Sequence, residues 1–157
     1  YDPDWAERHP RRAGWMALAG PGANFALAAL AVVAIRVLVA AGLGAPPQTA
    51  GFEQLIDPAS ADPLITQLAR FLSVLALLNA LLGTFNLMPM PPLDGAAVLK
   101  AFGGTAARRF VDALLGLPMA GLICLLIAWQ LFGVLAPWVF DGVLQVTYPD
   151  VTYGPQA

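Results

Sequence analysis

The sequence predicts an all-α polytopic membrane protein with about three transmembrane helices and a proline-rich broken segment at the end of the second. Composition is the first observation: 59% of the 157 residues are hydrophobic and 11% are charged, against about 25% charged in a typical soluble domain. The second is a positive mean hydropathy. The third is that the apolar residues fall into three runs, each close to the roughly 20 residues that cross a bilayer as a helix.

Alternating polar and apolar stretches divide the chain into segments. In chain order these are a basic juxtamembrane segment (1–14), a first span broken at GPGAN (15–43), an acidic extracytoplasmic loop (44–63), a second span ending in a proline-rich motif (64–95), a cytoplasmic interfacial segment (96–116), a third span (117–142) and a tail (143–157). Because proline and glycine interrupt helices, we expect the break in the first span at Pro21 and Gly22.

The distribution of charge predicts the orientation in the membrane. Basic residues precede the first span and separate the second from the third, whereas the 44–63 loop has three acidic residues and no Lys or Arg. Under the positive-inside rule, the N-terminal segment and the proline-rich motif face the cytoplasm. The net charge is −2, and the cations are scattered, so the sequence gives no support for a nucleic-acid partner.

Three reactive or charged residues have ordinary interpretations. Cys124 lies in an apolar run and is expected to be a buried, inert thiol. Arg36 lies toward the outer half of the first span and is expected to snorkel to the interface; pairing with an acidic residue of another span is the alternative. His9 is the single histidine of the chain, and three protein ligands are usual for a catalytic zinc, so we do not expect it to bind one.

The stretch FNLMPMPPLDG, residues 85–95, is unusual at the end of an apolar run. Its prolines remove backbone donors, and we expect them to hold an extended segment at membrane depth, where irregular backbone needs protein or a wet cavity around it. Asp94 could be an N-cap for the helix that begins at Gly95. It could instead be functional, because ionisable residues at such places mark sites, and Asn86 could hold an extended backbone or a bound peptide.

Two motifs together resemble the site-2 protease family of intramembrane zinc metalloproteases. The pattern Asn86-x-x-Pro89-x-Pro91-x-x-Asp94-Gly95 is similar to the N-x-x-P-x-P-x-x-D-G signature of that family. The segment LAGPGANFALA, residues 18–28, is similar to the A-G-P-x-x-N segment that opens the preceding span in compact bacterial members. The order of the two motifs agrees as well, and the resemblance covers most of residues 8–111.

The resemblance implies specific roles for these residues. In the family, two histidines of an H-E-x-x-H helix bind zinc, and the glutamate is the general base for attack of a zinc-bound water on a peptide carbonyl. The aspartate of the proline-rich motif is the third protein ligand, which here is Asp94. Substrate positioning or structural support then falls to Asn86, Asn24, Pro89, Pro91 and Gly95.

This sequence departs from the family in one large respect, because it contains no H-E-x-x-H. One hypothesis is that this helix lies upstream of Tyr1 in a complete endopeptidase that cleaves membrane proteins. The alternative is a catalytically incomplete relative that acts as a membrane scaffold or as a subunit of a larger complex. The resemblance implies zinc as the cofactor, a membrane-protein or peptide substrate in the lipid bilayer, and location in a bacterial inner (plasma) membrane.

Overall fold

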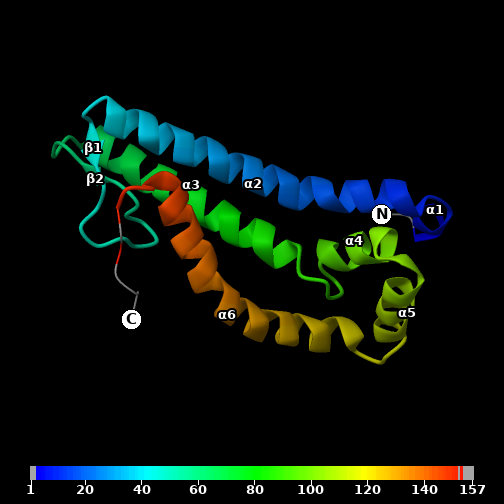
Figure 1. The fold of residues 1–157 in the computed structure, drawn as a ribbon. Coiled ribbons are helices and arrows are strands. Elements are labelled where there is room, and N and C mark those ends of the chain that lie inside the picture. The colour runs from blue at the N-terminus through cyan, green and yellow to red at the C-terminus, as the bar shows by residue number, and fades with distance from the viewer. Residues whose placement is uncertain (1–2, 152, 154–157) are drawn as a thin grey trace. The chain divides into compact units, whose positions relative to one another are not determined.

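A computed structural model describes residues 3–151 and 153 and consists mainly of helices (Figure 1). The elements in chain order are α1 (Pro3–Arg8), α2 (Pro10–Ala40), β1 (Gly44–Ala45), β2 (Asp57–Pro58), α3 (Pro63–Asn86), α4 (Asp94–Phe102), α5 (Gly104–Leu115) and α6 (Ala120–Thr147). The two strands pair antiparallel, Gly44 with Pro58 and Ala45 with Asp57.

Three helices of the described chain, α2, α3 and α6, are long and apolar enough to cross a membrane. Many of their large hydrophobic side chains are exposed, including Leu30, Leu64 and Trp138. Such surfaces suit a lipid environment, in which no polar shell is required. The predicted all-α class with about three membrane-spanning helices is confirmed, and the protein is a multi-pass membrane protein.

Local sequence signals fix the ends of α2 and α3. At the end of α2, Gly42 has φ 70°, and the N–H groups of Gly42 and Leu43 bond to the carbonyls of Val39 and Leu38 at 3.0 Å each. This is a Schellman ending, which requires the left-handed conformation that glycine adopts without strain. At the start of α3, the Asp62 carboxylate accepts the Leu64 N–H at 2.8 Å, which is an N-cap.

Helix α2 continues through the GPGAN sequence, so the expected break is absent (Figure 1). A proline inside a helix removes one N–H donor, but Pro21 is fully buried and the helix remains regular on both sides of it. Helix α2 begins at Pro10 and α6 extends to Thr147, so both helices are longer than the spans expected within them.

The described chain divides into two compact units. The "motif unit" contains the chain up to Ala23 and Leu82–Leu135. It therefore includes the proline-rich motif, most of the GPGAN segment, α4 and α5. The "core unit" contains Asn24–Leu81 and the chain from Ala136 onward.

A hydrophobic cluster organises the core unit. It brings together buried residues of α2, α3, the loop between them and the end of α6, among them Ile35, Leu55, Leu77 and Leu144, all at most 2% exposed. Two hydrogen bonds satisfy the backbone of buried Leu55, whereas the buried Tyr153 hydroxyl has no partner among the described residues. The Leu55 N–H donates to Ser73 Oγ at 2.9 Å, and the Tyr148 hydroxyl donates to the Leu55 carbonyl at 2.8 Å.

Arg36 is exposed near the end of α2, in the core unit. Its guanidinium donates to the carbonyl of Val146, in the last turn of α6, at 3.2 Å. The charged head therefore satisfies a carbonyl that the end of a helix leaves without an intrahelical partner. This contact is consistent with the expectation that the Arg36 side chain reaches the membrane interface. Among the described residues, Arg36 has no acidic partner.

Aromatic contacts link the helices of the motif unit. Phe85, near the end of α3, packs edge-on against Trp129 and Phe132 of α6, with ring centroids 6.3 and 5.2 Å apart. Trp15 of α2 packs edge-on against Phe102 of α4 at 5.6 Å. These contacts connect α3 with α6 and α2 with α4. They therefore involve the helix that precedes the proline-rich segment and the helix that follows it.

Candidate active site

The segment between α3 and α4 is a compact series of turns and not the extended strand expected from its prolines. The Met88 N–H bonds to the Phe85 carbonyl at 3.1 Å, Met90 N–H to the Met88 carbonyl at 2.8 Å, and Leu93 N–H to the Met90 carbonyl at 2.9 Å. The prolines lie between these donors, at positions where the turns use no N–H. Pro91 is buried, whereas Pro89 and Pro92 are exposed.

Gly95 allows α4 to pack directly against the end of α3. It is buried, and a Cβ atom at this position would collide with the carbonyl oxygens of both Leu87 and Met88. Since both colliding groups are backbone, no side-chain rotation could relieve the overlap. Gly95 therefore fixes the distance between the turns and the first residue of α4, which is Asp94.

Asp94 does not act as an N-cap. Helix α4 begins at Asp94 itself, its N-cap position is Leu93, and no side chain caps it. The carboxylate lies in the first turn, where the helix dipole favours negative charge. Among the described residues it has no hydrogen bond or ion pair, so the capping interpretation does not account for it.

The Asp94 carboxylate reaches the α2 helix at Gly20. A Cβ atom built on Gly20 would lie 3.2 Å from Asp94 Oδ2. The carboxylate therefore faces the side of Gly20 on which any other residue would carry its side chain. Asp94 is half-buried and Gly20 is exposed. Both residues belong to the motif unit.

The other predicted residues are distributed between the two units. Asn86 is the last residue of α3 and is half-buried, and its side-chain amide has no hydrogen bond among the described residues. It belongs to the same unit as Asp94, Pro89, Pro91 and Gly95. Asn24 is half-buried within α2 and is the first residue of the core unit.

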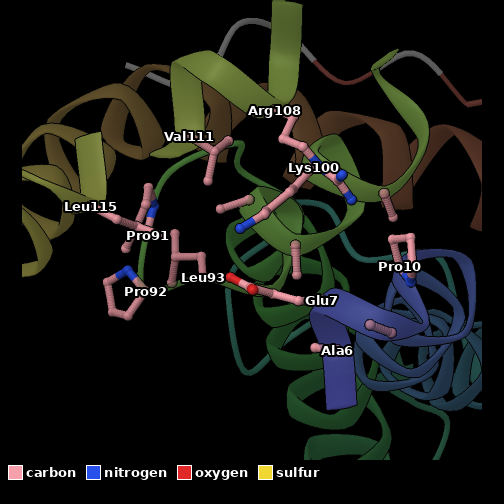
Figure 2. A pocket seen from close by; sticks show the side chains of 14 residues that line it. Ala6, Glu7, Pro10, Pro91, Pro92, Leu93, Lys100, Arg108, Val111 and Leu115 are labelled. Carbon is pink, nitrogen blue, oxygen red and sulfur yellow. The ribbon is translucent and has the colours of Figure 1, made fainter. Parts of the chain in front are cut away.

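A cavity of about 340 Å³ adjoins the proline turns (Figure 2). Its walls are mostly apolar and include Pro91, Pro92, Leu93 and Val111. The Glu7 and Lys100 side chains extend toward it from α1 and α4 (Figure 2). Lys100 is also paired with Asp112 of α5 at 2.6 Å. The same turns that carry Asp94 thus form one wall of a mainly apolar pocket, a common form of ligand site.

His9 and Cys124 do not join Asp94 in a group of metal-binding side chains among the described residues. His9 stacks on Trp5 at 5.1 Å, and its Nδ1 lies 3.2 Å from the Trp5 carbonyl. Cys124 is a free, buried thiol within α6, as expected. No group of three His, Cys, Asp or Glu side chains suited to a metal occurs among the described residues.

The described residues therefore do not form a complete catalytic zinc site, which usually takes three protein ligands. Asp94 alone fits the role of one ligand, because its carboxylate is half-buried and has no partner in the described chain.

A family model places the chain within a known class of membrane enzymes. Residues 2–128 match the model of peptidase family M50, the site-2 protease family. The chain therefore belongs to this family, and membership implies an intramembrane metalloprotease-like function. Comparisons with curated proteins and with solved structures gave no match.

Sequence reasoning missed two features of this site. The first is the approach of Gly20 to Asp94, and the only signal for it is the concentration of small residues in GPGAN. The second is the cavity, in which α1, α4 and α5 take part. Its walls come from residues as far apart as Ala6 and Leu115, and neither end carries a recognisable motif.

Proposed function

We propose that this chain is part of a site-2-protease-like zinc endopeptidase that cleaves membrane-protein substrates within or near the bilayer. The observation that carries the proposal is the Asp94 carboxylate. It stands in the family's proline-rich motif, is half-buried, does not cap its helix and has no partner in the described chain. A carboxylate without a partner beside a membrane-spanning helix is expected to be functional.

In this proposal Asp94 supplies one zinc ligand, and an H-E-x-x-H helix encoded upstream supplies two histidines and the general base. Bound zinc would polarise a carbonyl and lower the pKa of a bound water. Gly95 and the turns around Pro89 and Pro91 hold Asp94 at the start of α4. Asn86, whose amide is unpaired within the described residues, would hydrogen-bond the substrate backbone or the turns when substrate is bound, and Asn24 would support the site from α2.

The charge distribution supports an orientation for the enzyme. Arg11 and Arg12 near the start of α2 and Arg108 and Arg109 in α5 are all exposed, as basic residues on the cytoplasmic side would be. The proline-rich motif then faces the cytoplasm of a bacterial inner membrane. Substrates would be single-pass membrane proteins that unwind locally, because a helix engages its carbonyls in internal hydrogen bonds.

The upstream coding sequence provides the first test. An H-E-x-x-H on an apolar helix is expected there, and its absence would leave the scaffold or complex subunit as the better proposal. The second test uses the full-length protein in detergent or lipid nanodiscs with a single-pass substrate. We expect Asp94→Ala to abolish cleavage without lowering the unfolding temperature of the metal-free protein. Unchanged cleavage by this variant would refute the assignment of Asp94.

A further inference from the structure

The absence of a side chain at Gly20 suggests a role in the site that the motif resemblance does not give. Two glycines, Gly20 and Gly22, flank Pro21 in α2, and both are exposed. They differ in what an added Cβ would meet. At Gly22 nothing lies within 4 Å, whereas at Gly20 the nearest atom is Asp94 Oδ2 at 3.2 Å.

From this geometry we propose that Gly20 is a positioning residue that sets where the Asp94 carboxylate can lie. This inference rests on the proposed function of Asp94 as a zinc ligand. A Cβ at 3.2 Å from a carboxylate oxygen is tight, and the carboxylate can relieve it by moving a few tenths of an ångström. That movement costs a free side chain little, but metal ligands tolerate only about 0.2 Å around their ideal distances.

The backbone around Asp94 leaves the side chain as the part that must move. Gly95 lies against the carbonyls of Leu87 and Met88, so the backbone at the start of α4 is closely packed against the turns before it. Farther along the same pair of helices, a Cβ at the buried Gly14 would overlap Ala101 and Phe102. Helix α4 is therefore held close to α2 at both ends, and a methyl group at residue 20 would displace the carboxylate.

The test compares Gly20→Ala with Gly22→Ala in the full-length protein, with zinc affinity measured by competition with a chelator. We expect Gly20→Ala to weaken zinc binding about 10-fold, the lower end of the range for disturbing a group that orients a metal ligand. Gly22→Ala should bind zinc as the wild type does. Cobalt substitution gives a second readout, because the absorption bands of bound Co²⁺ respond to ligand geometry; only Gly20→Ala should alter them.

One difference between the two positions requires a control. Gly20 precedes Pro21, and a Cβ before a proline is disfavoured in a helix, so Gly20→Ala could lower stability without involving Asp94. The unfolding temperature of the metal-free Gly20→Ala protein measures the strain against Pro21, because the free carboxylate can move away from the methyl group at little cost. Zinc affinity measured well below that temperature then reports the displacement of the carboxylate.

The outcomes for this inference and for the proposed function are distinct. If Asp94→Ala loses zinc but Gly20→Ala and Gly22→Ala both bind it with wild-type affinity, the role of Gly20 is refuted and the proposed function stands. If Asp94→Ala itself retains zinc, the proposed function fails, and the inference fails with it. A loss of zinc affinity in Gly20→Ala alone, with an altered cobalt spectrum, supports the positioning role.

Discussion

The two units of the molecule differ in the polar groups that they leave without a partner. In the core unit, the backbone N–H and carbonyl of buried Leu55 are both satisfied by side chains, Ser73 and Tyr148, and the buried Tyr153 hydroxyl has no partner among the described residues. In the motif unit, the unpartnered side chains are those of half-buried Asp94 and Asn86, which stand in the family's proline-rich motif. We therefore expect the hydrogen bonds at Leu55 to support the fold and the motif unit to carry the chemistry.

The largest expected effect is that of Gly95→Ala in the motif unit. Its methyl group would overlap two backbone carbonyls, and overpacking of this kind costs up to about 3 kcal/mol. We expect a lower unfolding temperature together with loss of cleavage, since the turns and Asp94 must move. Gly133→Ala in α6 is the matched control, because a Cβ there meets nothing within 4 Å. Equal unfolding temperatures for the two variants would contradict the packing described for Gly95.

The next largest expected losses of stability are those of Tyr148→Phe and Ser73→Ala in the core unit. Each leaves one backbone group of Leu55 unsatisfied, at a cost of about 1–3 kcal/mol, and the two effects should not be additive because they share a residue. Zinc content and cleavage should be unchanged below the unfolding temperature. Ser60→Ala, at an exposed serine, should shift stability by less than about 0.5 kcal/mol. A loss of cleavage in a folded Tyr148→Phe protein would show that the units do not divide these roles.

Alkaline pH should destabilise the core unit. Burial raises the pKa of Tyr148, and burial followed by the charge of Asp57 raises the pKa of Tyr153. A raised folded-state pKa gives stability that is fully present below the unfolded value of about 10 and is lost as pH rises above it. The unfolding temperature should therefore fall progressively as the pH rises above about 10. Tyr148→Phe should reduce this dependence, and an identical pH profile in that variant would contradict the assignment.

The smallest expected effect is that of Lys100→Gln. The Lys100–Asp112 pair is 2.6 Å long, but its side chains are 28% and 48% exposed, and exposed pairs contribute less than about 1 kcal/mol. We expect a small change in unfolding temperature that vanishes at high salt. A shift comparable with that of Ser73→Ala would mean that this pair stabilises the motif unit far more than its exposure implies.

Much of the fold could be predicted because it depends on local patterns. The apolar runs are long, and end signals such as Gly42 and Asp62 act within a few residues of the helix ends that they fix. The break at Pro21 could not be predicted correctly, because tertiary burial of that proline offsets the loss of one donor. The turns after Asn86 were also missed, since prolines are compatible with both extended and turn backbones.

The candidate site could be predicted only as a set of residues. The resemblance assigns Asp94, Asn86 and Gly95 to the site by their spacing, and their roles stay a prediction. Spacing does not show that Asp94 lies beside Gly20 or that Gly95 meets the end of α3, because these contacts depend on how α2, α3 and α4 pack. The hydrogen bonds of Leu55 with Ser73 and Tyr148 likewise depend on tertiary contacts and have no signature in either motif.

The zinc content of the full-length protein, compared between Asp94→Ala and Tyr148→Phe, tests the central claim most directly. The account predicts that Asp94→Ala loses zinc while its metal-free form keeps the wild-type unfolding temperature. It predicts the reverse for Tyr148→Phe, which should unfold at a lower temperature and retain stoichiometric zinc. Stoichiometric zinc in Asp94→Ala would contradict the account.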